Sequence, residues 1–467
     1  MATYKILPTN FRELQNGKVL LSNLANHYQV LNNKKELQEC FIHESSQDID
    51  LLNKLEQKLF ISSPKDFESK VLLTASALAK NINRDLKSHR LIMIVPTLRC
   101  DHHCSYCQVS RVNSDLKGYD LEIESIPNII RWILKVERAP YKIEFQGGEP
   151  LLAFDFIRDF YEKFSESVGI DNFSIVITSS LSLLNKDIIN WCKNKPVEFS
   201  TSIDAGIKAH NKHRKLITKD SFQLVQRNIQ SITQNLGPNR VGTVSTITRE
   251  GLNGYDELVD THIALGLGGM FVRPVSPFGF AEGKQVNDIS VPDFMNFYRK
   301  LIKRVLSENV NGYKLVEYFL LIHYKRILNN PNSAYVDLMA PAGYLKNTLL
   351  FDYTGNIFGS DEARMVYRKY GNDSLILGHV NDENLDLTSS IHLLSESFNF
   401  DVPGCSDCVY QGSCGSDPVY HLQHYGEPIG LKGSSRFCEL HKSIFDFIFE
   451  LLESKEVKKI LDRWLCE

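Results

Sequence analysis

Three cysteines lie close together in the segment TLRCDHHCSYCQVSR, at Cys100, Cys104 and Cys107. Their spacing is C-x3-C-x2-C, and no fourth cysteine follows nearby. Zinc sites normally take their ligands as two separated pairs, so zinc here would need His102 or His103 as a ligand. Three thiolates on one short segment instead suit a cubane iron-sulfur cluster with one iron left open. An iron without a protein ligand predicts a catalytic site rather than a purely structural one.

Four further cysteines form a second group toward the carboxyl end: Cys405, Cys408, Cys414 and Cys438. Four thiolates can close a metal site, and their spacing alone fits either a four-thiolate zinc site or a 4Fe-4S cluster. The other three cysteines stand apart and are expected to be buried or inert thiols: Cys40, Cys192 and Cys466.

The composition indicates a packed globular protein. With 467 residues, of which 43% are hydrophobic, the chain can bury a large core and should divide into two or three domains. The formal net charge of -3 gives no basic field, so no nucleic acid partner is expected. The first 40 residues contain no signal-peptide arrangement, and no apolar run reaches the roughly 18 residues of a membrane span. We therefore expect no membrane partner and a cytoplasmic location.

Short β-branched or apolar runs alternate with helical patterns from about Arg90 onward, which is typical of βα units and a parallel sheet. Six strands are predicted, at 91–96, 142–146, 174–178, 197–203, 241–247 and 270–275. Helices are predicted near 126–134, with Ser125 as N-cap, and at 154–168, 186–194, 222–236, 255–265 and 292–307. The fold class is therefore α/β. Six units are too few for the usual eight-stranded barrel, which leaves a partial (β/α)6 TIM-like barrel, the architecture we expect, or a doubly wound open sheet.

Two other regions flank these units. Residues 1–89 combine strand-like runs at 4–6, 18–21 and 27–31 with helical stretches near 49–59 and 66–84, which predicts a small α+β module. Beyond about Glu308 the alternation stops, and a Gly- and Cys-rich region at 404–438 leads into a helical tail at 440–465. We therefore predict three domains: the module at 1–89, the barrel at 90–312 and a Cys-rich domain at 313–467.

The segment around the first cysteines resembles a known family. Cys100, Cys104, Tyr106 and Cys107 match the C-x3-C-x-aromatic-C pattern of radical S-adenosylmethionine (SAM) enzymes. The resemblance implies that the cysteines hold a 4Fe-4S cluster whose open iron binds the amine and carboxylate of SAM. Reductive cleavage of SAM would give a 5'-deoxyadenosyl radical that abstracts a hydrogen atom from the substrate. His102 and His103 are then expected to be ordinary loop residues.

Residues at the ends of later strands resemble the family's cofactor contacts. In EFQGGEPLL, Gly147 and Gly148 would let the backbone approach the methionyl amine, and Glu149 would accept from it. The resemblance extends to Ser180 at a position where the family often has Asn, to Ser202 and Asp204 for the ribose hydroxyls, and to Arg214 for the cofactor carboxylate. Together with Tyr106, these residues are the expected cofactor-binding set.

The second cysteine group resembles the SPASM extension of peptide-modifying radical enzymes, whose full form carries seven cysteines and two auxiliary clusters. Ser360 in TGNIFGSDEAR and Pro418 stand where that form has cysteines, so the first auxiliary site is expected to be lost. A fourth-ligand vacancy at Ser360 is the competing interpretation. The four cysteines of the second group match the ligands of the second auxiliary site. The resemblance therefore implies two 4Fe-4S clusters, one that binds SAM and one auxiliary.

Three segments resemble one subgroup, the His-Xaa-Ser system radical SAM maturases called HxsB: RCDHHCSYCQVSR, GSDEAR and DPVYHLQHYGEP. The subgroup implies a ribosomally made precursor peptide (RiPP) as substrate and an intramolecular crosslink as product. It also implies a partner maturase and a reducing electron donor such as flavodoxin or ferredoxin. The amino-terminal module is consistent with a leader-peptide recognition element, and a structural cap on the barrel is the alternative.

Two other functions stay open. One is a sulfatase-maturase-like oxidase of protein side chains, and the other is a degenerate, non-catalytic subunit that delivers a peptide. Several polar residues could face the substrate, although none is assigned as the proton acceptor: Asp361, Glu362, Asp417, Tyr420, His421 and His424. The catalytic residue is therefore unknown at this level.

Overall fold

The computed structural model describes residues 4–86, 89–217, 220–283, 289–328, 344–388, 390, 393, 399, 402–415 and 417–466. Its centre is a ten-stranded sheet with the order β16-β15-β14-β12-β11-β10-β6-β17-β18-β19. The six predicted strands are present and lie beside one another in chain order: β6 (Leu91–Thr97), β10 (Tyr141–Gly147), β11 (Phe173–Thr178), β12 (Val197–Ser202), β14 (Val241–Ile247) and β15 (Gly269–Pro274).

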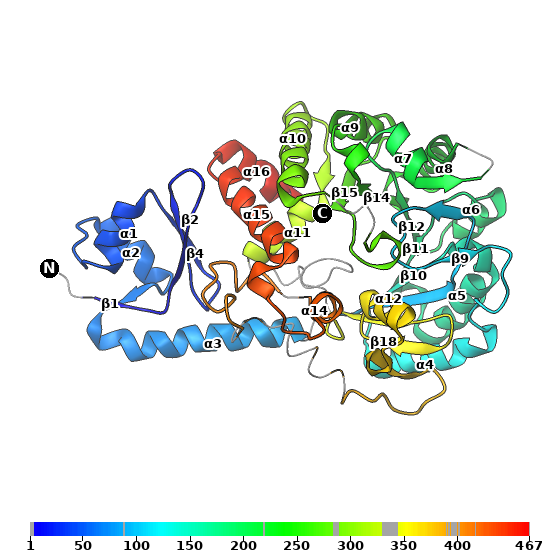
Figure 1. Cartoon of the computed structure of the whole chain (residues 1–467), viewed down its shortest axis with the longest axis horizontal. Helices are drawn as coiled ribbons and strands as arrows, with labels where there is room; N and C mark the ends of the chain where they lie inside the picture. Colours follow the sequence, from blue (N-terminus) through cyan, green and yellow to red (C-terminus); the bar gives the residue numbers. More distant parts are fainter. Residues whose placement is uncertain are drawn as a thin grey trace.

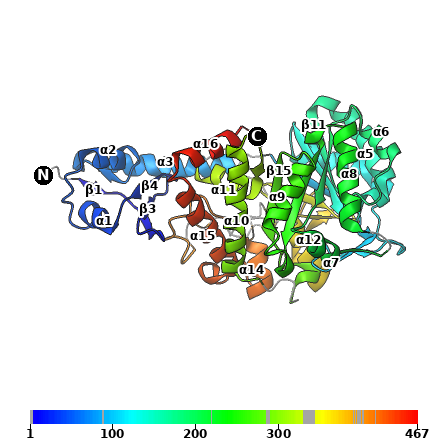
Figure 2. The same ribbon diagram turned by 90° about the horizontal axis from the view of Figure 1, so that it is seen from above.

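The order of these six strands decides between the two expected architectures. A doubly wound sheet reverses its order at a switch point, whereas here each parallel strand adds on the same side of the previous one. The crossovers therefore run in one direction, and the helices cover one side of a curved sheet (Figures 1 and 2). The partial (β/α)6 barrel is confirmed. The sheet continues at its two ends with four strands that the sequence did not predict: β16 (Val316–Glu317), β17 (Thr348–Phe351), β18 (Asn356–Phe358) and β19 (Ile376–His379).

Amphipathic helices pack against the barrel strands. Each predicted helix is present: α4 (Ile126–Val136), α5 (Phe154–Val168), α6 (Lys186–Cys192), α8 (Ser221–Asn235), α9 (Tyr255–Ala264) and α10 (Val291–Val310). Apolar side chains repeat at helical spacing on α4, where Ile126, Ile129 and Ile133 are fully buried. Ser125 lies at the predicted N-cap position of this helix, but its side chain does not cap it. A short 3-10 turn precedes α4, and the Ser125 hydroxyl donates to the carbonyl oxygen of Glu122 instead of accepting from the helix.

The amino-terminal module is a separate α+β unit. It contains a three-stranded antiparallel sheet of β2 (Asn10–Glu13), β3 (Val19–Ser22) and β4 (Tyr28–Leu31), together with the pair β1 (Lys5–Ile6) and β5 (Ile61–Ser62). Its helices are α1 (Lys34–Phe41), α2 (Ile49–Gln57) and α3 (Phe67–Leu86). The sequence did not predict α1, β2 or β5, because these short elements carry few apolar residues and draw their stability from the packed module.

The carboxyl-terminal part contains α11 (Tyr318–Ile327), α12 (Asp361–Tyr370), α14 (Pro418–Tyr425), α15 (Arg436–Leu451) and α16 (Lys455–Trp464). Of these helices, α15 and α16 lie between the module and the barrel (Figures 1 and 2). The predicted helical tail is two helices rather than one, because Ser454 starts α16 by accepting from the backbone N–H of Val457. Within the described residues, no helix combines the length and apolar character needed to cross a membrane.

Candidate functional site: a cavity lined by three cysteines

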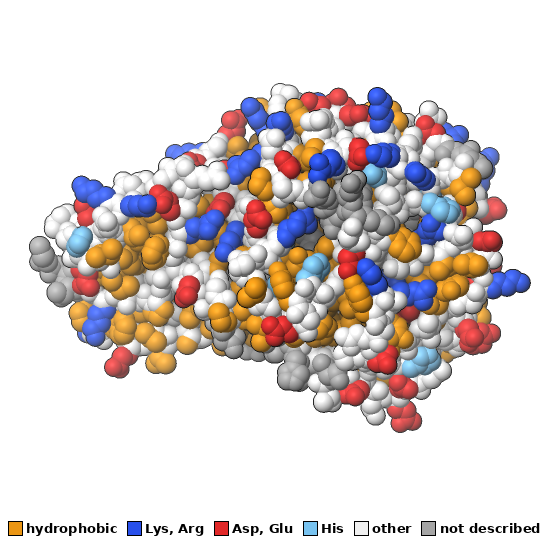
Figure 3. Space-filling model, viewed as in Figure 1, with side chains coloured by type: hydrophobic (Ala, Val, Ile, Leu, Met, Phe, Trp, Pro, Cys, Tyr) orange, Lys and Arg blue, Asp and Glu red, His pale blue; other side chains and the backbone are white. Residues whose placement is uncertain are grey.

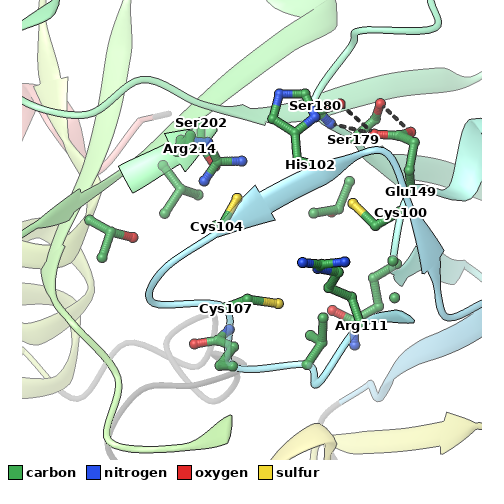
Figure 4. Close-up of a pocket in the computed structure, with 18 of the residues that line it drawn as sticks. Cys100, His102, Cys104, Cys107, Arg111, Glu149, Ser179, Ser180, Ser202 and Arg214 are labelled. Carbon is green, nitrogen blue, oxygen red and sulfur yellow. Dashed lines mark hydrogen bonds between the residues drawn. The ribbon is translucent and has the colours of Figure 1, made fainter. Parts of the chain in front are cut away.

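A cavity opens where the barrel strands end at their carboxyl edge. The space within it, including its open mouth, is about 1000 Å³. We call it the cysteine cavity because Cys100, Cys104 and Cys107 all line it (Figure 4). Further lining residues come from the ends of four strands and the turns that follow them: Gly147, Gly148, Glu149, Ser179, Ser180, Ser202 and Thr246.

The cysteine segment is held by a short strand pair. β8 (His102–Cys104) pairs antiparallel with β13 (Arg214–Leu216), which places Cys104 opposite Arg214. Burial raises the pKa of Cys104 to about 11, and the positive charges of Arg214 and Arg111 oppose this rise. In Figure 4 the guanidinium group of Arg111 points into the space that the three thiols surround. The cavity therefore supplies cations that favour the thiolate form of its cysteines.

The two glycines after β10 are required by a close approach of backbones. A Cβ atom at Gly148 would lie 2.1 Å from the carbonyl oxygen of Arg99, and one at Gly147 would lie 2.6 Å from that of Thr97. Gly147 also has a φ of +127°. The glycines let the strand end pack directly against the start of the cysteine segment. The glycines have this packing role whether or not they also let the backbone approach a cofactor, as the resemblance implies.

Glu149 is buried and surrounded by donors from its own chain. One carboxylate oxygen accepts from the Leu151 N–H at 3.1 Å and the Ser179 hydroxyl at 2.7 Å. The other accepts from the N–H and the hydroxyl of Ser180, at 2.8 and 2.6 Å. Burial raises the pKa of Glu149, and the hydrogen bonds of Ser180 and Ser179 oppose the rise. Ser180 thus supports Glu149, while a bond from Glu149 to a cofactor amine stays a prediction.

Arg214, Tyr106 and Asp204 form one hydrogen-bonded cluster. An Arg214 nitrogen donates to the Tyr106 hydroxyl at 3.1 Å, and this hydroxyl donates to the carboxylate of Asp204. Asp204 also accepts from the Thr246 N–H at 3.1 Å and is only 2% exposed. Tyr106, Ser202 and Arg214 line the cysteine cavity, whereas the described lining does not include Asp204. Asp204 therefore orients Tyr106, and its contact with a ribose stays a prediction.

The expectation that His102 is an ordinary loop residue is wrong. Its ring lies in β8, is 3% exposed and lines the cysteine cavity. One ring nitrogen is 2.9 Å from the carboxylate of Asp101, and the other is 3.1 Å from the hydroxyl of Ser221. Asp101 also accepts from Ser182 at 2.6 Å, and the Ser182 and Ser180 hydroxyls lie 2.9 Å apart. Polar contacts therefore connect the wall around Glu149 with the cysteine segment.

The lining residues that the sequence did not single out include Arg111 and Thr201. Both carry a buried side-chain atom that has no hydrogen-bond partner among the described residues, Nε of Arg111 and Oγ1 of Thr201. Buried polar atoms are usually paired, so these two atoms mark places where a bound group would be accommodated. The only signal in the sequence was position: Arg111 follows the third cysteine by four residues, and Thr201 precedes Ser202 at a strand end.

The second cysteine group is assembled from a loop and a helix start. Cys405, Cys408 and Cys414 lie on the loop at 402–415, and Cys438 lies in the first turn of α15, where its N–H donates to Ser435 at 3.1 Å. Burial raises the pKa of Cys414, and the charges of the other three cysteines raise it further. The four thiols are therefore neighbours, and none forms a disulfide.

The two departures from the SPASM pattern both begin helices. The Ser360 hydroxyl accepts from the N–H of Ala363 at 3.2 Å and so caps α12. Pro418 is the first residue of α14, directly after its N-cap Asp417. Residues that the full pattern would use as ligands here have ordinary helix-capping roles, which agrees with the expected loss of the first auxiliary site.

The donor sets can be tested against the clusters that the resemblance implies. Thiolates are the usual ligands of 4Fe-4S clusters, and both cysteine groups offer free thiols. The first group also faces an open cavity, whereas two cysteines of the second group, Cys408 and Cys414, pack against the hydrophobic core. Within the described ranges, no three His, Cys, Asp or Glu side chains form a group suited to a single metal ion. The chemistry and setting of both groups fit the clusters.

Comparison with known families agrees with this description of the barrel. Residues 94–260 match the model of the radical SAM superfamily. That segment contains the first cysteine group and every predicted cofactor-binding residue. Residues 94–260, the barrel part of the chain, therefore match the radical SAM superfamily.

Two curated relatives are both uncharacterized archaeal proteins. One, from Methanothermobacter thermautotrophicus, is 28% identical over 114 residues, which are 24% of this chain and 42% of the relative. The other, from Methanocaldococcus jannaschii, is 24% identical over 223 residues, which are 46% of this chain and 70% of the relative. The match thus spans less than half the length of the first relative.

Solved structures share the fold at low sequence identity. Native anSMEcpe with bound AdoMet has a TM-score of 0.65 and 15% identity, and the alignment covers 80% of this chain and 99% of that one. Streptococcus suis SuiB bound to the precursor peptide SuiA has a TM-score of 0.55 and 14% identity, over 94% of this chain and 100% of that one. The SuiB alignment thus takes in more of this chain than the anSMEcpe alignment does.

Proposed function

We propose that the chain is a radical SAM enzyme that modifies a ribosomally made precursor peptide, with an intramolecular crosslink as the product. The observation that carries the proposal is the joint placement of the three cysteines, the glycine pair and Glu149 around one cavity. Among the solved structures of similar fold, SuiB is bound to a precursor peptide and anSMEcpe to AdoMet together with a peptide. Both supply a precedent for a peptide substrate on this fold.

The chain's own residues would each have a defined part. When bound, a 4Fe-4S cluster and SAM supply a carbon radical that removes a hydrogen atom from the substrate. Cys100, Cys104 and Cys107 would hold the cluster, and Arg214, positioned by Tyr106, would hold an anionic group of the cofactor. The carboxylate of Glu149 would bind a cationic or hydrogen-bond-donating group of the cofactor. The enclosing strands would exclude water from the reactive centre.

The second cysteine group supports an auxiliary cluster. We infer that Cys405, Cys408, Cys414 and Cys438 hold a 4Fe-4S cluster, in line with the SPASM resemblance and with the helix-capping roles of Ser360 and Pro418. A sulfatase-maturase-like oxidase is the alternative enzyme, and the loss of the first auxiliary site disfavours it. A non-catalytic delivery subunit is disfavoured because all three cysteines of the first group still line an open cavity.

Anaerobic reconstitution tests the enzyme proposal. We expect about eight iron atoms per chain, two 4Fe-4S clusters, and release of 5'-deoxyadenosine when the protein is reduced in the presence of SAM. Replacing Cys100, Cys104 and Cys107 together by Ala should abolish the release and leave about four irons. Cys466→Ala, at an exposed cysteine outside both groups, is the matched control and should change neither the iron content nor the release of 5'-deoxyadenosine. Fully loaded protein that released no 5'-deoxyadenosine would contradict the proposal.

The product is tested by mass spectrometry of a precursor peptide coexpressed with the chain, for which we expect a loss of two hydrogens. The subgroup resemblance to HxsB further suggests a substrate with His-Xaa-Ser repeats, a partner maturase and a flavodoxin or ferredoxin as electron donor. A peptide recovered with an added methyl group or with inverted stereochemistry alone would instead indicate a different radical reaction.

The amino-terminal module is proposed to bind the leader of the peptide. Its three-stranded sheet has β2 as an edge strand, and Phe11 on that strand is 61% exposed. Hydrophobic side chains also gather over this module in Figure 3. An extended peptide could add to such an edge through backbone hydrogen bonds. Phe11→Ser should then weaken leader binding measured by calorimetry without changing 5'-deoxyadenosine release, whereas unchanged binding would favour a structural cap.

A further inference from the structure

A second cavity adjoins the cysteine cavity and has an acidic wall. The space within it, including its open mouth, is about 660 Å³, and it shares Arg273 and Ser276, at the end of β15, with the cysteine cavity. Glu362 from α12 and Asp417 at the start of α14 both line it, so we call it the carboxylate pocket. A group bound in this pocket would lie next to the site of radical chemistry.

Glu362 is the unusual residue of the carboxylate pocket. It is 0% exposed, and neither of its carboxylate oxygens has a hydrogen-bond partner among the described residues. Its neighbour Asp361 is equally buried but lies 2.7 Å from the guanidinium group of Arg364. One oxygen of Asp417 accepts from the N–H groups of Val419 and Tyr420, at 3.1 and 3.0 Å. Of these three carboxyl groups, Glu362 is the one with no ion pair or hydrogen bond to either oxygen among the described residues.

The surroundings of Glu362 call for a positive partner. Burial raises its pKa, and the charges of Asp417 and Asp361 raise it further. Buried carboxylates in proteins are normally paired, because an isolated one is strongly disfavoured. Two cationic residues, Arg273 and Arg436, also line the pocket, and Arg436 donates a hydrogen bond to the carbonyl oxygen of Ile289 at 2.9 Å. Two acidic groups thus lie beside an open space, and one of them has no hydrogen-bond partner in the part of the chain that the structure describes.

The remaining walls are suited to an aliphatic stem. Phe278, Phe319, Tyr420 and Phe437 line the carboxylate pocket together with Leu440. Aromatic faces attract cations, and apolar walls cover the methylene groups of long basic side chains. A lysine or arginine side chain would satisfy both features, with its stem on the aromatic wall and its charged end at the carboxylates.

We propose that the carboxylate pocket is a subsite for a lysine or arginine side chain of the peptide substrate, bound by Glu362 and Asp417. This inference rests on the proposed function, since it takes the substrate to be a peptide. It assigns a basic residue close in the peptide to the position that is modified. Glu362 is thus a specificity residue, with no part in the chemical step.

Panning tests the subsite without knowledge of the natural peptide. The cluster-loaded chain with SAM, immobilised anaerobically, is panned against a random heptapeptide phage library. We expect the recovered peptides to be enriched in Lys or Arg over the unselected library. The same panning on Glu362→Gln should lose this enrichment, whereas Glu427→Gln, at an exposed carboxylate, should keep it. Melting temperatures of the variants show whether each one folds.

A double-mutant cycle then tests the contact itself. One recovered peptide is synthesised with its lysine or with norleucine, which keeps the apolar stem and removes the charge. We expect the norleucine peptide to bind wild type about tenfold more weakly or worse, and to bind Glu362→Gln as well as the lysine peptide does. Recovered peptides without enrichment in Lys or Arg would overturn the subsite. So would additive affinity losses from the norleucine change and from Glu362→Gln. Either result would leave the proposal of a peptide substrate standing. Recovery of no peptide at all would overturn the proposed function as well.

Discussion

At the scale of single residues, the wall around Glu149 shows how a small side chain can position a functional one. Ser180 gives two of the four hydrogen bonds that Glu149 accepts, one from its N–H and one from its hydroxyl. Only the hydroxyl bond depends on the side chain. Losing a hydrogen bond to a charged group generally costs about 1.5–3 kcal/mol.

Ser180→Ala should therefore lower the free energy of unfolding by about 1.5–3 kcal/mol, because a buried carboxylate loses a donor. It should also weaken SAM binding, because Glu149 is then less well oriented. Urea unfolding and equilibrium dialysis of SAM measure the two effects. Ser167→Ala, at an exposed helix position, is the control and should stay within about 0.5 kcal/mol of wild type. A Ser180→Ala protein as stable as wild type would show that Glu149 does not need this donor.

The sequence predicted the side chains that carry chemistry but not all of their contacts. The cysteines, the glycine pair and Glu149 could be found because their spacing or their place after a strand carries information. His102 could not be found, because its burial depends on Ser221, which is 119 residues away in the chain. The hydrogen bond from Tyr106 to Asp204 could not be found either, because these two residues lie 98 positions apart. Local patterns identify residue types, whereas side-chain direction depends on distant partners.

At the scale of elements, the junction between β10 and the cysteine segment depends on two glycines. Gly148→Ala would put a Cβ atom 2.1 Å from the carbonyl oxygen of Arg99, so one of the two backbone segments must move. We expect a loss of more than about 2 kcal/mol in the free energy of unfolding, measured by urea denaturation. We also expect little 5'-deoxyadenosine release.

The matched control is Gly242→Ala in β14, where an added Cβ atom would meet nothing within 4 Å. This change should be neutral or should stabilise the protein by about 0.5 kcal/mol, because alanine loses less backbone entropy on folding. If Gly148→Ala were equally harmless, the close approach at the cysteine segment would not be a constraint.

The contact between β14 and α9 should make the barrel sensitive to acid. His262 is fully buried; one ring nitrogen donates to the carbonyl oxygen of Leu258 at 2.7 Å, and the other accepts from Thr243 at 2.7 Å. Burial lowers its pKa to about 4, while the bond to Leu258 opposes this shift. The unfolded chain therefore binds a proton at a higher pH than the folded chain does. The stability contributed by neutral His262 is present above about pH 6.5 and is lost as the pH falls toward 4.

Between pH 7 and pH 5 this residue should account for about 2 kcal/mol of lost stability. Replacing His262 by Gln, which can still donate and accept, should remove that part of the pH dependence. Urea unfolding of both proteins at the two pH values gives the change in the free energy of unfolding for each. The difference between the two changes isolates His262, because the other titrating groups contribute equally to both. Parallel pH profiles for wild type and His262→Gln would argue against the assignment.

Elements were predictable in proportion to their length and periodicity. The six long strands and their helices have clear apolar patterns, and the structure confirms them. Short elements such as β2 and α1 were missed, because they bury little surface of their own and form only within the packed module. The tail was predicted as one helix because the Ser454 cap is a single polar residue between two amphipathic stretches.

At the scale of the whole molecule, the amino-terminal module docks on the loop that carries the second cysteine group. The Asn10 amide donates to the carbonyl oxygens of Ser406 and Cys408, at 3.0 and 3.2 Å. Tyr28 donates to Ser413 at 2.8 Å on the same loop. The sequence predicted three domains but gave no sign of this contact, because its partners lie almost 400 residues apart. A peptide bound to the module would thus lie on a unit that touches the backbone of a predicted cluster ligand.

The strongest polar link of this dock is an ion pair. Two Arg12 nitrogens donate to the two carboxylate oxygens of Asp446, at 2.9 and 2.8 Å, and Tyr410 donates to the same carboxylate. The Asp446 side chain is 11% exposed and the Arg12 side chain 38%, so solvent screens the pair only in part. Removal of the arginine would leave a mostly buried carboxylate without its cation. We expect a cost of about 1–2 kcal/mol, reduced from that of a fully buried pair by this exposure.

Arg12→Ala should therefore loosen the dock and speed hydrogen exchange at the amides of both β2 and residues 405–414, measured by mass spectrometry. Exchange within β11, at the centre of the barrel sheet, should not change. Lys34→Ala is the matched control, because Lys34 and Glu13 form an ion pair whose side chains are 64% and 48% exposed, and such pairs contribute little. Faster exchange at β2 alone would mean that the module moves without affecting the cysteine loop. Faster exchange at both would establish the mechanical connection through which peptide binding could reach the second cysteine group.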